Sequence, residues 1–247
     1  METQVTGQYA PVLTVSLGAG ESIVGESGEL SWYGGDVSLQ TGKSTGMAKG
    51  GLLGAVKRAA GGGTYFMTQY TAASEGFVAF AVKAPGEIRE LALDGSRAYV
   101  VHRHGFMCCE QGIELEIFLQ KKLGVGIFGK EGFMLQKLSG TGKTWIELHG
   151  QVVPFTLEAG QKLLVHPGHL GMFDATVSLD LTQVPGIKNK LFGGDGLFLA
   201  QLTGPGDVWL QTITLAGLAH ALQPYIVTET GGEVGTAAVL GSLLKNN

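Results

Sequence analysis

A pattern that recurs three times along the chain is the feature that most constrains its fold. Phe-x-x-Gln, a small or Gly-containing turn and then an aromatic residue occur in "FMTQYTAASEGF", "FMLQKLSGTGKTW" and "FLAQLTGPGDVW". The three motifs begin at Phe66, Phe133 and Phe198, so the intervals are 67 and 65 residues. A nearly constant period of this kind indicates repeated structural units.

The segments between these motifs keep the same period and look like strands and turns. "VSLGAGESIV", "LALDGSRAYVV" and "FTLEAGQKLLV" each join two apolar runs through a turn that ends in glycine, and the segments that follow alternate apolar and polar residues. Glycine makes up 41 of 247 residues, about twice the usual ~7%, as many tight turns require. We therefore predict an all-β fold.

The period predicts one domain over residues 1–226, with repeats of approximately 10–82, 88–148 and 152–213. The three units would bury their apolar faces around a pseudo-threefold axis. An insertion in the first repeat is expected to hold a short helix at Leu52–Ala60, and Leu215–Tyr225 has helical spacing that should end at Pro224. Residues 227–247 are expected to form a mobile or weakly helical tail.

Matched residues of the repeats predict a shared core. The large apolar side chains would fill its centre, and the repeated amides would satisfy backbone groups of the turns. These structural residues are Phe66, Gln69, Phe133, Gln136, Trp145, Phe198, Gln201 and Trp209.

The stretch "LGVGIFGKEG" (Leu123–Gly132) matches a dinucleotide-binding glycine pattern and nearly matches a phosphate-binding loop. Glycines at positions 132, 140 and 142 leave no room for the helix that the dinucleotide pattern requires, and Glu131 stands where a magnesium-binding Ser or Thr is needed. "FGGDG" repeats the same bend one unit later. The stretch is therefore interpreted as a structural turn.

Four histidines raise the hypothesis of a metal site. His102 and His104 lie two residues apart, which predicts one face of a strand, and His166 and His169 lie at the matching place of the next repeat. Neutral imidazoles on neighbouring strands can bind zinc or a similar ion if further ligands such as Glu110 are near. The alternative, which we favour, is that they are polar residues at strand ends.

No nucleophile or carboxylate pair stands out, and no cofactor is expected. Cys108 and Cys109 are adjacent and read as part of a buried strand. The net charge of −4 argues against a nucleic-acid partner. The chain shows no signal sequence and no apolar run of membrane-spanning length, so we expect a soluble cytoplasmic protein.

The long motifs "APGEIRELAL", "GVGIFGKEGFMLQKLSGTGKTWIELHG" and "GGDGLFLAQLTGPGDVWLQT", with "GGLLGAVKRAAGGGTYFMTQYTA", resemble the altered-inheritance-of-mitochondria family over Tyr9–Tyr225. Its bacterial members are grouped with the tryptophan RNA-binding attenuator protein-like superfamily. The resemblance implies an all-β, internally duplicated fold of β-sandwich or β-helix-like units, and it supplies no catalytic residues. The RNA implication does not transfer, because this acidic chain lacks a repeated basic and aromatic ring.

The function predicted from these observations is that of a non-enzymatic scaffold or binding module that forms a homo-oligomer. One alternative is a protein that binds a metal or small ligand through the histidines. Another is a peripheral membrane protein that binds through the basic and apolar insertion, where Lys49, Lys57 and Arg58 flank leucines and a valine.

Overall fold

The computed structural model describes residues 1–43, 66–121, 133–183 and 198–225. Three of the predictions fall outside these ranges. They concern the helix at Leu52–Ala60, the glycine stretch Leu123–Gly132 and the tail at 227–247.

The described residues lie predominantly in strands, which confirms the prediction of an all-β domain. The strands are β1 (Glu2–Thr6), β2 (Val12–Leu17), β3 (Ser22–Glu26), β4 (Trp32–Lys43), β5 (Phe66–Ala81), β6 (Gly86–Asp94), β7 (Tyr99–His102), β8 (Phe106–Cys109), β9 (Ile113–Lys121), β10 (Phe133–His149), β11 (Val152–Leu157), β12 (Lys162–Val165), β13 (Leu170–Asp174), β14 (Ser178–Gln183), β15 (Phe198–Thr203) and β16 (Gly206–Gln211). A short 3₁₀ turn, η2 (Pro167–His169), precedes β13. The predicted C-terminal helix is confirmed as α2 (Leu215–Leu222), followed by the 3₁₀ turn η4 (Gln223–Tyr225).

Alternation of apolar and polar residues explains these strands. In β2 the side chains of Leu13, Val15 and Leu17 are buried while those between them reach the surface. In β9 the side chain of Leu115 is buried, while Glu114 on its neighbouring position is partly exposed. The carboxylates of β9 therefore lie on the solvated face of the strand.

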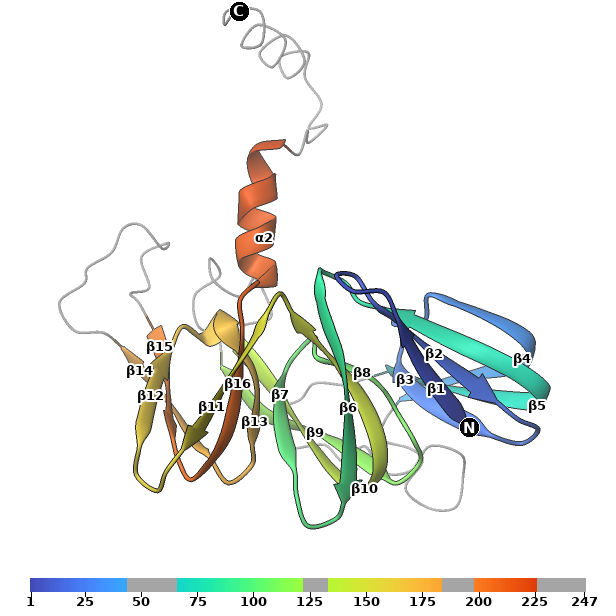
Figure 1. Cartoon of the computed structure of the whole chain (residues 1–247), viewed down its shortest axis with the longest axis horizontal. Helices are drawn as coiled ribbons and strands as arrows, with labels where there is room; N and C mark the ends of the chain where they lie inside the picture. Colours follow the sequence, from blue (N-terminus) through green and yellow to red (C-terminus); the bar gives the residue numbers. More distant parts are fainter. Residues whose placement is uncertain (44–65, 122–132, 184–197, 226–247) are drawn as a thin grey trace, which may run out of the picture.

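Long strands organise the sheet (Figure 1). The first half of β10 pairs with β7 and β9, and its second half pairs with β6 and β8. The strand β5 pairs in the same manner with β3 at one end, with β2 at the other and with β4 along its length. In the last part of the chain β15 pairs with β12 and β14, and β16 pairs with β11 and β13.

We call β1–β5 the first group, β6–β10 the second and β11–β16 the third. The first and second groups are joined where β3 pairs with β8, and the second and third where β7 pairs with β13. Figure 1 shows the three groups side by side in a row, with the N-terminal group at the right. Among the described strands, none of the third group pairs with one of the first. The structure therefore does not confirm an arrangement around one axis.

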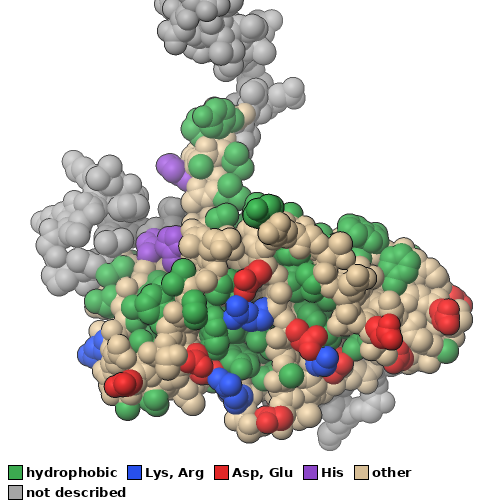
Figure 2. Space-filling view, in the orientation of Figure 1, with side chains coloured by type: hydrophobic (Ala, Val, Ile, Leu, Met, Phe, Trp, Pro, Cys, Tyr) green, Lys and Arg blue, Asp and Glu red, His purple; other side chains and the backbone are tan. Residues whose placement is uncertain are grey.

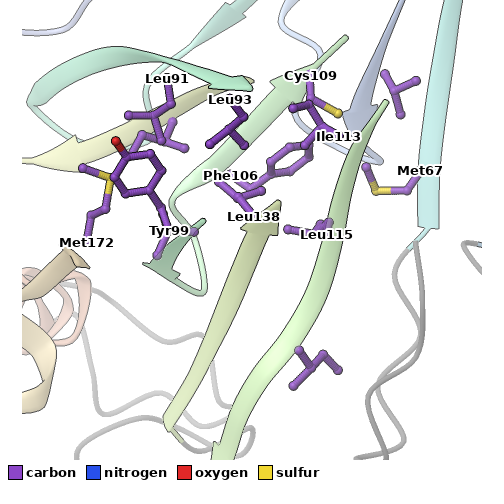
Figure 3. Close-up of a cluster of buried hydrophobic side chains, with 14 of the residues drawn as sticks. Met67, Leu91, Leu93, Tyr99, Phe106, Cys109, Ile113, Leu115, Leu138 and Met172 are labelled. Atoms are coloured by element: carbon purple, nitrogen blue, oxygen red, sulfur yellow. The ribbon is translucent and has the colours of Figure 1, made fainter. Parts of the chain in front are cut away.

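The core consists of three clusters that cross the boundaries between groups. The central cluster, shown in Figure 3, combines Phe106 and Leu138 of the second group with Met67 of the first and Met172 of the third. A second cluster packs Trp145 of β10 among side chains of the first group. The third packs Phe133 and other residues of the second group against the third group.

The repeated residues occupy matched backbone positions but unequal environments. Gln69, Gln136 and Gln201 pair across the sheet with Val24, Val101 and Leu164 respectively. The prediction that all the aromatic residues fill a shared core is wrong for Phe66, whose side chain is 48% exposed, whereas Phe133 and Trp145 are buried and Phe198 and Trp209 are partly buried. The reason is that each group packs against different neighbours.

The amides do not satisfy the turn backbone in the predicted way. Gln69 donates from Nε2 to the Thr71 hydroxyl at 3.2 Å, and its Oε1 has no partner among the described residues. Neither amide atom of the buried Gln136 makes a well-oriented hydrogen bond within the described ranges, although its side chain interacts with the carboxyl group of Glu26.

Candidate functional site

A cavity of about 230 Å³ lies where the second and third groups meet the base of α2. Figure 2 shows histidine side chains gathered at this base. The lining residues are His102, Arg103, His104, Phe133, Met134, His149, His166, Pro167, Gly168, Gln211, Thr214, Leu215 and Ala216. We call this cavity the histidine pocket.

The fold brings the two histidine motifs to one pocket. His102 ends β7, His104 lies in the turn that leads to β8, and His166 immediately precedes η2. His169, at the end of η2, is not part of the lining. The prediction that His102 and His104 share a strand face is wrong, because β7 ends at His102 and the amide of Gly105 turns back to bond the His102 carbonyl at 2.8 Å.

His149 is the pocket residue that the sequence analysis missed. It ends β10, and its ring centroid lies 5.0 Å from that of His102. Its side chain is 1% exposed, and neither ring nitrogen has a well-oriented hydrogen bond among the described residues. The spacing Trp145, Glu147, His149 on one strand face is the signal that could have revealed it.

Gln211 holds together the chain segments that form one side of the histidine pocket. Its Oε1 accepts a hydrogen bond from the backbone N–H of His149 at 3.0 Å, and its Nε2 donates to the carbonyl of Gly168 at 3.2 Å. The backbone carbonyl of Gln211 also accepts from Nδ1 of His169 at 2.8 Å. One buried amide therefore ties the end of β10 to η2 and to the end of β16.

Hydrogen bonds define the tautomers of three histidines. Nε2 of His102 lies 3.1 Å from the carbonyl of Glu147, and because a carbonyl only accepts, this nitrogen carries the proton. The same reasoning puts the proton of His169 on Nδ1, which faces the carbonyl of Gln211. Nδ1 of His166 instead accepts from the N–H of Gly168 at 3.3 Å, so in the neutral ring Nε2 is the donor.

The pocket keeps these imidazoles neutral at pH 7. Burial, followed by the nearby His149, lowers the pKa of His102 to about 3. Burial and the charges of Arg103 and Lys83 lower the pKa of His104 to about 4. Burial and the neighbouring His169 also lower the pKa of His166. Neutral rings can donate and accept hydrogen bonds without the desolvation cost of a charge.

A buried ion-pair network lies behind the pocket. Nζ of Lys83 is 2.7 Å from Oε1 of Glu147 and 2.6 Å from Oε2 of Glu29. Oε2 of Glu147 accepts from the backbone N–H of Lys83 at 2.8 Å and lies 3.5 Å from Nε2 of His149. Burial raises the pKa of Glu147, but His149 and Lys83 outweigh it and bring that pKa down to about 2.

The described residues give little support for a metal site or for a reactive thiol. The described residues contain no group of three or more His, Cys, Asp or Glu side chains placed to hold a metal ion. Cys108 and Cys109 are fully buried, and burial raises the pKa of both thiols, that of Cys109 to about 12. Neither sulfur therefore has the thiolate character that a nucleophile needs.

The fold defines the class of protein: it is a sheet-rich, antiparallel β domain with one C-terminal helix. None of the helices in the described ranges is long and apolar enough to cross a bilayer. The sequence matches the family described as Mitochondrial biogenesis AIM24 over residues 3–213, and the chain belongs to this family. The resemblance found in its motifs is thereby confirmed.

Two further comparisons agree with this assignment. An uncharacterised protein of Streptococcus pyogenes serotype M6 is 24% identical over 225 residues, which cover 89% of this chain and 88% of that protein. A crystal structure of a protein from Streptococcus pyogenes superimposes with a TM-score of 0.69 at 19% identity, covering 91% of this chain and 99% of the other. The crystal structure shows that the two proteins share a fold.

Proposed function

We propose that the protein is a non-enzymatic binding module and that the histidine pocket is its ligand site. The observation that carries this proposal is His149, a buried side chain in the pocket wall whose Nδ1 has no hydrogen-bond partner among the described residues. Buried polar groups without partners cost stability, and such groups in native proteins call for a functional explanation. A ligand that hydrogen-bonds this ring would supply one.

A small organic molecule suits the pocket better than a metal ion. The wall combines imidazoles with the apolar side chains of Phe133, Pro167 and Leu215, which is the mixture typical of small-molecule sites. A metal held by His102, His104, His166 and His169 remains the alternative proposal. It would require His169 to exchange its hydrogen bond to Gln211 for metal coordination.

A thermal-shift screen against small metabolites and divalent metals tests the proposal, because a ligand that binds only the folded state raises the apparent Tm. We expect organic ligands that raise the Tm of the wild type and of His220→Ala but not of His149→Phe. His220 lies on α2 and is not among the lining residues. If no compound raised the Tm of the wild type more than that of His149→Phe, the assignment of the pocket as a ligand site would be refuted.

Self-association is the second proposal, and helix α2 supports it. Leu218, Leu222 and Tyr225 are exposed and recur at helical spacing along the projecting C-terminal segment (Figures 1 and 2). We infer that this apolar stripe packs against a second copy of the chain. A homo-oligomeric scaffold of this kind would act in the cytoplasm without nucleic acid.

We also propose that the three groups are related repeats of the attenuator-protein-like kind. Matched pairing of the three glutamines and the equivalent joins between groups support this. Membrane contact through the insertion falls on residues outside the described ranges. Liposome flotation with and without residues 43–60 tests it, and equal behaviour of the two proteins would rule it out.

A further inference from the structure

The ring of His149 offers the histidine pocket a hydrogen-bond acceptor. Its Nε2 lies 3.5 Å from Oε2 of Glu147, so the neutral ring carries its proton on Nε2, toward the carboxylate. Nδ1 is then the acceptor. It has no hydrogen-bond partner among the described residues, and the side chain is only 1% exposed. A buried acceptor of this kind costs stability until a donor is supplied.

His102 brings a second acceptor to the same pocket. Its Nε2 carries the proton, because it faces the carbonyl of Glu147 at 3.1 Å, and this leaves Nδ1 as an acceptor. The ring centroids of His102 and His149 lie 5.0 Å apart. The second group therefore lines the pocket with two imidazoles whose Nδ1 atoms both accept.

His166 supplies a donor from the third group. Its Nδ1 accepts from the N–H of Gly168 at 3.3 Å, so in the neutral ring Nε2 carries the proton. His166 lines the same pocket as His102 and His149. The pocket therefore suits a ligand group that both donates and accepts a hydrogen bond, as a hydroxyl does.

The charges around the pocket favour a neutral ligand. A carboxylate has no proton to donate to Nδ1 of His149. An ammonium group has protons, but it would lie close to Arg103, which lines the pocket. Burial and the charges of Arg103 and Lys83 already lower the pKa of His104, so a further cation is disfavoured there. A neutral O–H group avoids both conflicts.

The rest of the wall and the size of the pocket suit an aromatic body. Phe133, Met134, Pro167 and Leu215 contribute apolar surface. The volume of about 230 Å³ exceeds that of an apolar cavity of roughly 150 Å³ that binds benzene, so one substituted ring has room. A hydroxyl on an aromatic ring is more acidic than an aliphatic one and is therefore the stronger donor to an imidazole nitrogen.

We propose that the histidine pocket binds small neutral phenols. The phenolic O–H donates to Nδ1 of His149, its oxygen accepts from Nε2 of His166, and the ring lies against Phe133 and Pro167. This inference rests on the proposed function and adds the chemical class of its ligand.

Calorimetric titration of the full chain with phenol, anisole and toluene tests the need for a donor. Anisole keeps the oxygen of phenol but has no O–H, and toluene has nearly the shape of phenol with a methyl group in place of the hydroxyl. We expect phenol to bind at least about tenfold more tightly than either, because the other two leave the buried acceptor of His149 without a partner.

Substitution of His149 tests where the hydroxyl binds. His149→Phe keeps a flat ring but removes the acceptor, so phenol and toluene should bind this variant with about equal affinity. His220→Ala, on α2 and outside the lining, should keep the tenfold preference for phenol. Circular dichroism establishes that each variant is folded, and if His149→Phe does not fold, the comparison of the three probes on the wild type still decides.

The outcomes separate this inference from the proposed function. Equal affinity of the wild type for the three probes, or a preference for phenol that persists in His149→Phe, would overturn the phenol site while leaving a ligand pocket. Compounds that raise the Tm through the pocket, without any binding of phenol, would overturn it in the same way. If neither the probes nor any compound of the wider screen bound, the inference and the proposed function would both fall.

Discussion

At the scale of single residues, the Lys83–Glu147 ion pair is expected to contribute strongly to stability. The Glu147 side chain has no solvent exposure, and Lys83 is its charged partner. Lys83→Met leaves that carboxylate buried without its cation and near the carboxylate of Glu29. We expect a loss of roughly 3 kcal/mol in the free energy of unfolding, measured by urea denaturation.

Lys143 provides the matched control for this substitution. It pairs with Glu90 at 2.8 Å, but both side chains are substantially exposed. Lys143→Met should therefore leave the denaturation midpoint almost unchanged. Equal effects of the two substitutions would show that the Lys83 network does not stabilise the fold.

Glu26 should make the folded protein less stable as the pH rises, which is the opposite of the effect of most carboxylates. Burial and the nearby Glu29 raise the pKa of Glu26 from 4.5 to about 7. Between these values the folded protein holds a proton that the unfolded chain has lost, so this group's contribution to stability falls as the pH rises from about 4.5 to 7.

Glu26→Gln removes this dependence, because the amide does not ionise. At pH 8 we expect the variant to be more stable than the wild type by roughly 2–3 kcal/mol, with the difference vanishing near pH 4. Urea denaturation across pH 4–8 measures it. Parallel pH profiles for the two proteins would contradict the raised pKa.

At the scale of elements, α2 is the part whose surface most needs a partner. No residue of this helix is buried. Leu222→Glu places a charge in the apolar stripe and should shift the protein to a lower oligomeric state in light scattering at micromolar concentration. His220→Glu, two residues away and about 200° around the helix, is the control. A wild type that is monomeric, or a His220→Glu variant that dissociates equally, would contradict self-association through this stripe.

The strands and the helix could be predicted from the sequence, whereas the pocket could not. Alternation predicted the strands, and Pro224 predicted the end of α2, because these features depend on neighbouring residues alone. The pocket depends on distant ones: His149 and His102 come together because β8 and the turn before it lie against the end of β10. The turn after His102 was missed because the sequence "HRHG" fits a strand end and a turn equally well.

At the scale of the whole molecule, the joins between groups predict cooperative unfolding. Trp145 belongs to β10 of the second group, yet it is buried among side chains of the first group, such as Leu13 and Phe80. Trp145→Ala should cost roughly 3–5 kcal/mol and lower the temperature of one shared transition in calorimetry. Trp209→Ala, at a partly buried site, should cost less. Separate transitions for the first group and the remainder would contradict this coupling.

The histidine pocket is the central claim about the whole molecule, and NMR of the imidazole nitrogens tests it most directly. In the ligand-free protein at pH 7 the account predicts neutral Nε2–H tautomers for His102 and His166. Addition of a ligand found in the thermal-shift screen should shift the signals of His149 and of the other pocket histidines while leaving those of exposed His220 unchanged. Protonation of His102 or His166 at pH 7, or a ligand titration that shifts the signals of His220 but not those of His149, would contradict the account.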